Sequence, residues 1–515
     1  MDQATENMCK DSTSITSPAK DKKDPAKDQS GNGSASFSGK LLKNYFYNGS
    51  YKLLLIIIPI LTTPYLARVL GKDKLGIDGY VLSVVTLVEL FGALGINLYA
   101  NREVAYVRDN KQKLTNLYYE LQYIRLFLCG IVLAGFVGFS FFSQYKIFFL
   151  IHSLSLVGYF LDVTWLFIGL EEMKSPVIRN VIIKLLQTAL VFILIRSRGD
   201  LYKYVLITAS CTFVSSLCMY PYVGRYIGKV QKKQLNIKRH IKPVLLLFLP
   251  QAASSLYVQF DRTMIGLLAS NISYVSIYDK AETIVKVPLQ LTAATTAVML
   301  PRISNEFVKG RIENIKQLVM KEIRYIFLFL IPMAFGLISI ANHLTVWYLG
   351  SEYTESVSVV MLLTPTILTI GMGEVLGSQL MISFNKTKEM TLAFGLGAIS
   401  NIILNSILIP RFNADGAAIA TVIAEAMVLV IQWKTTREYI YTSKILASFI
   451  KKLIASLAMF AAIEQMDRMW HGGHVIFVIQ IAAGGVIYLV LLLLMRDNEL
   501  MEGIRLVSKK LRRRK

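Results

Sequence analysis

Two apolar stretches between residues 257 and 290 contain an unusual number of ionisable side chains. These residues are Asp261, Arg262, Asp279, Lys280, Glu282 and Lys286. A charge inside membrane hydrocarbon costs roughly 2.5–3.5 kcal/mol on insertion scales, so a group of this size requires an aqueous or charge-paired interior. The positions i, i+3, i+7 and i+11 share one face of a helix, and here they hold Asp279, Glu282, Lys286 and Gln290. The pattern predicts a polar stripe that lines a cavity.

Acidic residues also interrupt apolar stretches elsewhere along the chain. A carboxylate in a low-dielectric environment can titrate near neutral pH, which suits the coupling of transport to protons or sodium. Each carboxylate can equally be a structural partner of a cation, as Glu282 is for Lys286 four residues later, in the order that favours an ion pair. The candidates for coupling or gating are Glu89, Asp162, Asp261, Asp279, Glu282, Glu374 and Glu425.

The elements that position these residues are expected to be membrane-spanning helices. The chain has 515 residues, of which 54% are hydrophobic and 17% charged, and its mean hydropathy is +0.48. This composition is too apolar for a soluble protein. Apolar runs of about 20 residues, the length that a helix needs to cross a bilayer, recur along the chain, without the alternation typical of membrane β-strands. We therefore expect an all-α polytopic membrane protein.

The net charge of +22 does not indicate a nucleic-acid-binding protein, because the basic residues lie in short connectors between apolar runs. This is the distribution that the positive-inside rule describes. The connector 225–242 has seven basic residues and no acidic one. The four cysteines form no CxxC pair and are interpreted as small core residues. No metal or cofactor is expected.

The apolar runs predict fourteen spans, arranged as two six-helix bundles around a central cavity with two peripheral C-terminal helices. The expected spans are 51–71, 77–100, 117–141, 146–170, 176–196, 203–224, 243–268, 275–300, 323–343, 356–383, 389–409, 416–436, 445–464 and 474–495. An even number of spans agrees with the basic connectors, which place both termini in the cytoplasm. The expected segments are a disordered cytoplasmic tail (1–40), an N-terminal bundle (41–224), a basic cytoplasmic linker (225–242), a C-terminal bundle (243–436), spans thirteen and fourteen (437–495) and a basic cytoplasmic tail (496–515).

Three stretches of the chain resemble a known family. They are Pro64–Gly71, the region from Asp261 through Tyr278 to Ser304, and the region from Asn401 through Pro410 to Thr421. Over residues 41–495 the chain resembles bacterial polysaccharide flippases, a branch of the multidrug/oligosaccharidyl-lipid/polysaccharide exporter superfamily. One residue departs from the family pattern. Asn413 stands where glycine is usual, and because Asn tolerates a left-handed turn the turn is expected to be kept.

The resemblance implies a cargo of undecaprenyl-diphosphate-linked oligosaccharide and alternating access between the two bundles. It also implies a place in the cytoplasmic membrane, contact with membrane lipids, and polysaccharide polymerase and glycosyltransferases as partners. A diphosphate needs cations along its route, and sugars need hydrogen-bond partners and aromatic faces. The expected cargo-binding residues are Arg68, Arg262, Lys280, Lys286, Gln259, Tyr257 and Asn97. The last two spans carry no ionisable residue in their interiors, and their uncharged surface would suit the isoprenoid tail.

Structural roles stay open for the cationic candidates. One alternative is that Lys286 forms an ion pair with Glu282 and does not contact the cargo. Arg68, at the end of a helix, can instead extend to the outer headgroups. Two other functions also stay open: a drug or cation antiporter of the same superfamily, or a membrane-embedded enzyme of polysaccharide synthesis. The antiporter predicts a cavity dominated by acids and aromatics. The enzyme predicts a large connector or domain with catalytic residues, and the connectors of this chain are too short for one.

Overall fold

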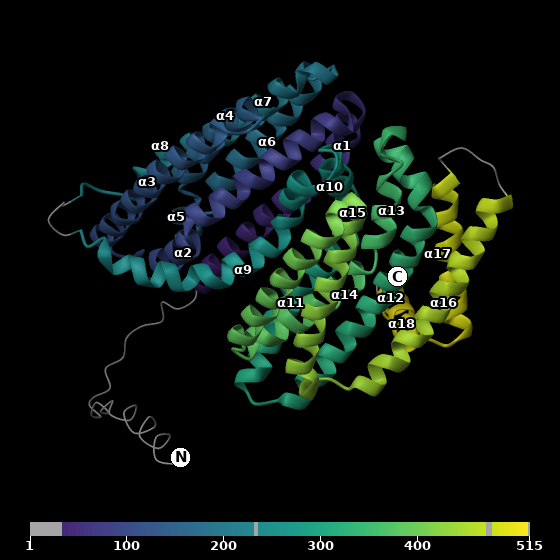
Figure 1. The fold of residues 1–515 in the computed structure, drawn as a ribbon. Helices are drawn as coiled ribbons and strands as arrows, with labels where there is room; N and C mark the ends of the chain where they lie inside the picture. Colours follow the sequence, from purple (N-terminus) through teal and green to yellow (C-terminus); the bar gives the residue numbers. More distant parts are fainter. Residues whose placement is uncertain (1–32, 231–234, 470–475, 513–515) are drawn as a thin grey trace, which may run out of the picture.

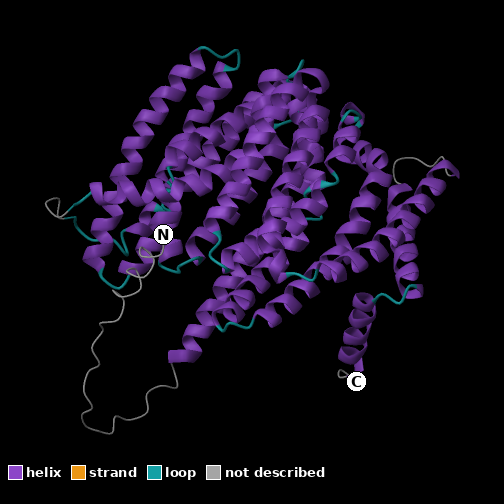
Figure 2. Cartoon of the chain, turned by 60° about the horizontal axis from the view of Figure 1, so that its bottom comes forward, coloured by secondary structure: helices purple, strands orange, loops and turns teal. Residues whose placement is uncertain are grey.

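The computed structural model describes residues 33–230, 235–469 and 476–512, and nearly all of them lie in helices (Figures 1 and 2). No strand occurs in these ranges, which confirms the expected all-α class. The helices of the N-terminal half are α1 (Gly33–Ala93), α2 (Ile96–Val107), α3 (Lys111–Phe141), α4 (Lys146–Leu161), α5 (Thr164–Gly169), α6 (Lys174–Leu194), α7 (Leu201–Leu217) and α8 (Tyr220–Val223). The helices after the basic linker are α9 (Lys238–Leu268), α10 (Ser273–Val285), α11 (Gln290–Val308), α12 (Ile312–Leu349), α13 (Ser356–Leu363), α14 (Thr366–Gly373), α15 (Thr387–Thr436), α16 (Thr442–Met469), α17 (Ile476–Leu494) and α18 (Asn498–Arg512).

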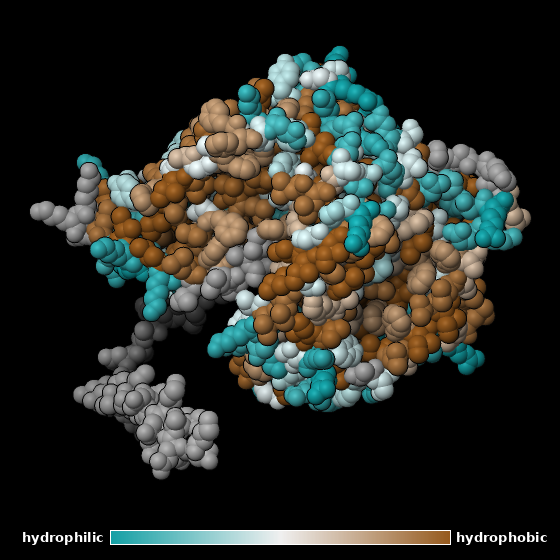
Figure 3. All heavy atoms as spheres, in the orientation of Figure 1, coloured by the Kyte–Doolittle hydropathy of each residue, from teal (hydrophilic) through white to brown (hydrophobic). Residues whose placement is uncertain are grey.

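Two groups of helices lie side by side, with the last helices at the edge of the second group (Figure 1). In the first group, α3 packs on α1, α2 and α4, and α7 packs on α4 and α6. In the second group, α15 packs on α9 and α13, while α12 packs on α11, α14 and α16. The helices α9 and α1 contact each other and join the two groups. On the face shown in Figure 3, apolar residues form a broad belt across both groups, and hydrophilic residues gather above and below it.

The candidate membrane spans are either single long helices or pairs of helices that meet at a bend. Nine helices in the described ranges are long and apolar enough to cross a membrane, and two bent helix pairs raise the number to eleven. Two of the long helices, α1 and α15, each cover two expected spans because helical hydrogen bonding continues across a kink, at Gly71 and at Asn413 respectively, and α9 covers one further expected span. The expected number of fourteen is compatible with this arrangement.

The eighth and tenth expected spans are broken, which the sequence did not predict. The helices α10 and α11 meet at 53°, and α13 meets the segment Thr366–Met381 at 42°. Part of the latter is a π-helix, Glu374–Met381, a feature that locally disturbs the α-helical hydrogen-bond pattern. The break after Val285 means that Gln290 starts a new helix. The expected face from Asp279 to Gln290 is therefore not continuous.

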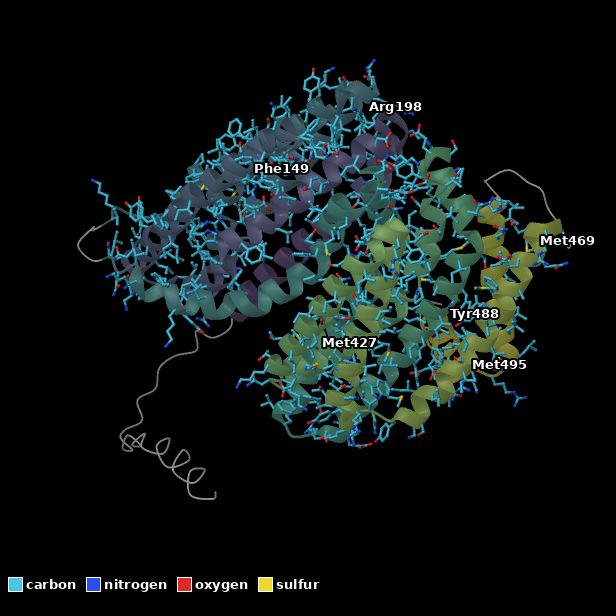
Figure 4. The ribbon with its side chains drawn as sticks, viewed as in Figure 1. Phe149, Arg198, Met427, Met469, Tyr488 and Met495 are labelled. Atoms are coloured by element: carbon cyan, nitrogen blue, oxygen red, sulfur yellow. The ribbon has the colours of Figure 1, made fainter. Side chains whose placement is uncertain are left out.

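At one end of the bundle the two halves are in close contact. We call this end the outer end, after the orientation that the basic connectors predict. Here the backbones at Gly76 and Ile272 lie so close that a Cβ on Gly76 would sit 2.3 Å from the Ile272 carbonyl oxygen. Lys72 Nζ lies 2.8 Å from Glu355 Oε1, and Arg198, at the tip of the N-terminal half in Figure 4, pairs with Glu352. The outer ends of the two halves are thus held together by close packing and by ion pairs.

The C-terminal segment folds back as helix α18 instead of forming only a basic tail. Lys452 of α16 is fully buried, and its Nζ lies 3.0 Å from Asp497 Oδ2 and 2.9 Å from Glu499 Oε2. The pKa of Asp497 lies below its usual range. Burial alone would raise this pKa, but the hydrogen bond from the Leu500 backbone N–H and the Lys452 ammonium have the larger, opposite effect. At the other end of the chain, α1 begins at Gly33, inside the segment expected to be disordered. Residues 1–32 of that segment lie outside the described ranges.

The kink in α15 occurs at Asn413, where φ is 50° and ψ is −125°. The positive φ agrees with the expected turn, but ψ lies far from the left-handed helical value of about +47°, so the conformation differs from the expected one. Asn413 Oδ1 accepts hydrogen bonds from Ser270 N and Ser270 Oγ, both at 2.9 Å. These bonds explain why asparagine is compatible with a backbone conformation that favours glycine.

We expect Asn413→Ala to destabilise the protein by about 1–3 kcal/mol, because alanine keeps the strained backbone and loses both hydrogen bonds. Asn413→Gly should be close to neutral, since relief of the strain offsets the lost bonds. Thermal unfolding of the two purified variants in the same detergent checks this order. Equal melting temperatures for the alanine and glycine variants would contradict it.

Candidate functional site

Five charged residues of α9, α10 and the break after α10 form one connected group, which we call the α10 network. Arg262 Nη2 lies 2.8 Å from Asp279 Oδ1 and 2.7 Å from Glu282 Oε2. Lys280 Nζ lies 2.7 Å from Asp279 Oδ2, and Lys286 Nζ lies 2.6 Å from Glu282 Oε1. Three cations thus face two carboxylates, which leaves the network with a net charge of +1.

The two acids of the α10 network are held by cations from different elements. Their side chains are only 19% and 11% exposed, for Asp279 and Glu282 respectively, so the cost of burying them is offset by ion pairing. Arg262 Nε, by contrast, is buried without a hydrogen-bond partner. Lys286 is 40% exposed. The network therefore combines mutual neutralisation with one spare positive charge and an unused donor.

Asp261 faces away from its neighbour Arg262 and forms a separate polar site. Its carboxylate, on a residue only 3% exposed, accepts hydrogen bonds from Tyr278 Oη at 2.7 Å, Thr421 Oγ1 at 2.7 Å and Asn405 Nδ2 at 2.6 Å. Asn405 Oδ1 and Asn401 Nδ2 are buried beside it without hydrogen-bond partners. Helices α9, α10 and α15 thus enclose a carboxylate among neutral oxygen- and nitrogen-bearing groups.

The N-terminal half contains a second set of polar residues. Asn97 of α2 accepts a hydrogen bond of 2.5 Å from Arg125, a buried residue of α3, and donates to Tyr159 Oη at 3.5 Å. Asp162, at the end of α4, lies 3.3 Å from Arg179 Nη1. Glu89 is half-buried in α1, within electrostatic range of Tyr159. Asn97 and Asp162 are therefore engaged in contacts within their own half and do not join the α10 network.

The remaining predicted residues are dispersed. Arg68 is exposed near the outer end and donates to the backbone carbonyl of Trp347, so the structure does not bring it into the α10 network. Gln259 is half-buried in α9, and the side chain of Tyr257 lies outside the described residues. Glu374 accepts a hydrogen bond of 3.4 Å from Thr296, and Glu425 is half-buried in α15.

A large apolar groove lies between the C-terminal half and the first part of α1. Its volume is about 1260 Å³, and its walls come from α1, α12, α16, α17, α18 and the residues around the break after α10. Tyr488 of α17 points toward α12 (Figure 4), where its hydroxyl donates to the Leu328 carbonyl at 3.0 Å. Lys286 and Gln290 also line this groove. The α10 network and the apolar groove therefore meet at Lys286.

Some residues of these sites were not predicted as functional. Asn401, Asn405 and Tyr278 belong to the family-like stretches without having been assigned a role, yet they lie around Asp261. Two asparagines four residues apart in an apolar span share a helix face, and that spacing was a usable signal. The partnership of Asn97 with Arg125 had no comparable signal, because it depends on how α2 packs on α3.

The charged groups of this site form ion pairs and hydrogen bonds with one another. In the described ranges no group of three or more His, Cys, Asp or Glu residues is arranged to hold a metal ion. A two-half bundle of membrane-spanning helices, with broken helices and a charged interior next to an apolar groove, defines a membrane transporter. The chain is a multi-pass membrane protein of this class.

Comparisons with known proteins agree with this class and identify the family. The chain belongs to the polysaccharide biosynthesis protein family, whose model matches residues 41–307, more than half of its length. It is 27% identical over 380 residues to a protein of Escherichia coli (strain K12) named "Putative O-antigen transporter", covering 72% of this chain and 91% of that protein. The predicted family is confirmed, and the relatives' names as transporters and flippases confirm the expectation of a transporter instead of an enzyme.

Solved structures show the same fold. The lipid II flippase MurJ in an inward closed conformation has a TM-score of 0.69 and 19% identity, covering 87% of this chain and 98% of that one. A multidrug resistance MATE family transporter in an inward-facing conformation has a TM-score of 0.59 and 14% identity, covering 77% and 95%. At these identities the likeness shows that the chain shares the fold of these two transporters.

Proposed function

We propose that this protein flips undecaprenyl-diphosphate-linked oligosaccharide units across the cytoplasmic membrane, for the assembly of a capsule, an exopolysaccharide or another cell-surface polysaccharide. The family, a relative named as a putative O-antigen transporter and a relative named as a probable glycan biosynthesis flippase support this class of cargo. The distribution of basic connectors supports a chain with both termini in the cytoplasm. Polysaccharide polymerase and glycosyltransferases, which use and supply such cargo, are the partners that this function requires.

The observation that carries the proposal is the position of Lys286. Its ammonium belongs to the α10 network and also lines the apolar groove. A lipid-linked diphosphate presents two negative phosphates directly attached to a long apolar chain. Cations bind phosphate oxygens strongly in a site of low dielectric, and the adjacent groove removes the apolar chain from water. One lysine at the junction therefore suits a molecule in which these two parts are also adjacent.

The α10 network can hold a diphosphate without a new charge being brought in. Its net charge is +1, and Arg262 Nε is a buried donor without a partner. When no cargo is bound, the two carboxylates pair with Arg262 and Lys286. The phosphates of an anionic cargo can take the place of a carboxylate at either cation. Arg68 lies nearer the outer end, where it is placed to contact the phosphates after the cavity opens outward. The asparagine and glutamine side chains of both halves supply hydrogen-bond partners for the sugars.

Asp261 is the carboxylate best placed to couple transport to a cation gradient. It is buried, it accepts hydrogen bonds from three neutral groups, and it lies next to Arg262 in the sequence. Binding of a proton or a sodium ion would remove the charge of the carboxylate and change how α9 packs against α10 and α15. Because Arg262 is on the same helix, such a change would reach the α10 network directly.

Reconstitution tests the proposal. Full-length protein in vesicles should expose a fluorescently labelled undecaprenyl-diphosphate oligosaccharide on the opposite leaflet, as measured by loss of protection from a membrane-impermeant quencher. We expect Lys286→Ala to slow this exposure by about tenfold, equivalent to about 1.4 kcal/mol. Lys321→Ala is the matched control, because Lys321 is 54% exposed and pairs with Glu502 away from the network.

Two results would contradict the proposal. Normal exposure of the oligosaccharide by a well-folded Lys286→Ala variant would remove Lys286 from the cargo site. Failure of the wild-type protein to flip the labelled lipid, together with exchange of cationic drugs for protons, would favour an antiporter of the same superfamily.

A further inference from the structure

A second cavity, of about 590 Å³, lies in the N-terminal half and is separate from both the α10 network and the apolar groove. It is formed by α3, α8 and the connector after α8, with contributions from the ends of α4 and α7. In Figure 1, α3 and α8 lie on the side of the N-terminal half that is remote from α13 and α15. We call it the tyrosine pocket, because its lining includes Tyr118, Tyr119, Tyr123 and Tyr220.

One polar group in the wall of this pocket lacks a partner. Gln122 is only 7% exposed; its Nε2 donates to Tyr220 Oη at 3.2 Å, while its Oε1 is buried without a hydrogen bond. Exchanging the two amide atoms leaves Nε2 unpaired instead, so neither orientation satisfies the side chain. Tyr220 Oη already donates to the Leu161 carbonyl at 3.1 Å. Leaving a buried amide unsatisfied is costly, and a ligand hydroxyl in the pocket that Gln122 lines would give it a partner.

The rim of the pocket is basic. Lys111, Arg225 and Lys229 are exposed; the last two directly follow the lining residues Gly224 and Gly228. A Cβ on Gly228 would lie 3.7 Å from Lys111 Cε, which places this lysine at the rim as well. A cluster of cations at a pocket mouth attracts an anionic group.

The opposite side of the pocket is apolar and open to the surface. Its lining residues Leu126 and Leu217 are exposed, at 44% and 42%, and α3 is among the helices apolar enough to cross a membrane. A soluble sugar phosphate has no part that would use this side. A membrane lipid has one, because its acyl chains continue from the headgroup along the apolar helix surface.

We propose that the tyrosine pocket binds an acidic glycerophospholipid with a hydroxyl-bearing headgroup. The phosphate lies toward Lys111, Arg225 and Lys229, a headgroup hydroxyl donates to Gln122 Oε1, and the acyl chains pass over Leu126 and Leu217. The site is distinct from the cargo pathway. It ties the N-terminal half and the start of the basic linker to the acidic lipids of one leaflet.

Native mass spectrometry of the full-length protein tests this proposal with two lipids, dioleoyl phosphatidylglycerol and dioleoyl phosphatidylcholine. The wild-type protein should retain one phosphatidylglycerol molecule more tightly than any phosphatidylcholine. Gly224→Trp should weaken this retention by about tenfold, because Gly224 lines the pocket and its Cβ position faces open space. Gly135→Trp on α3 is the matched control, since its Cβ position is also open but lies outside the pocket.

Two further variants separate the headgroup contacts from folding. Gln122→Leu removes the unpaired amide and should weaken phosphatidylglycerol binding without lowering the melting temperature of the lipid-free protein. Arg225→Gln with Lys229→Gln changes only side chains at the rim and should reduce the preference for phosphatidylglycerol. Equal retention of the two lipids by the wild-type protein would overturn the proposal, as would unchanged retention by Gly224→Trp.

Discussion

Asp261→Asn is expected to lower the rate of gradient-driven flipping by about a hundredfold, equivalent to about 2.8 kcal/mol. The carboxylate accepts three hydrogen bonds. In Asp261 both carboxylate oxygens accept hydrogen bonds, whereas an asparagine has one acceptor oxygen and one NH₂ donor. The NH₂ group of an asparagine at this position would therefore lie against a neighbouring donor and could not accept its hydrogen bond. Asparagine also cannot change its charge, so the proposed response of this site to a cation is lost. The measurement is the vesicle assay with an imposed sodium gradient or an imposed proton gradient.

The two gradients distinguish the coupling ion. The wild-type rate should rise with one of them, and Asp261→Asn should show the same low rate with both. Asp415→Asn is a suitable control, because Asp415 is a half-buried carboxylate of α15 at the outer end that accepts a hydrogen bond from Ser358. A wild-type response to a gradient that persists in Asp261→Asn would exclude Asp261 as the coupling site.

The sequence contained enough information to predict the class of fold. Apolar runs of membrane-spanning length follow directly from hydropathy, and the structure has helices in all of the expected positions that it describes. The breaks after Val285 and after Leu363 do not show in the hydropathy of the surrounding residues. A proline lies close to each break, Pro288 and Pro365, and proline disfavours the continuation of a helix. Proline alone does not locate such a break, because Pro332 lies inside the continuous helix α12.

The sequence was also informative about local charge pairs and much less so about distant ones. The pairing of Lys286 with Glu282 follows from helical spacing and is present. The partners of Arg262 and Asp261 come from other helices, α10 and α15, and adjacent residues on a helix point in different directions. Arg68 is another expected cargo-binding residue, and its position relative to the α10 network depends on how α1 packs near α12. The structure places Arg68 beside Trp347 instead.

Arg262→Leu is expected to have the second large effect, with transport reduced by about a hundredfold and the free energy of unfolding lowered by about 3–5 kcal/mol. Arg262 bridges Asp279 and Glu282, both largely buried, and its removal leaves them with only Lys280 and Lys286. The net charge of the α10 network falls from +1 to zero. Thermal unfolding and the vesicle assay on the same preparation measure the two effects separately.

The double variant Arg262→Leu with Glu282→Gln separates a structural role of Arg262 from a role in cargo binding. It removes one cation and one carboxylate, so the network returns to a net charge of +1 with Asp279 paired to Lys280. If Arg262 serves only to neutralise the acids, this variant should regain both stability and transport. We expect it to regain most of the stability and little of the transport, because the guanidinium supplies planar, directed donors to phosphate oxygens that a leucine cannot replace. Full recovery of flipping would show that the cargo senses the net charge of the network and makes no specific contact with Arg262.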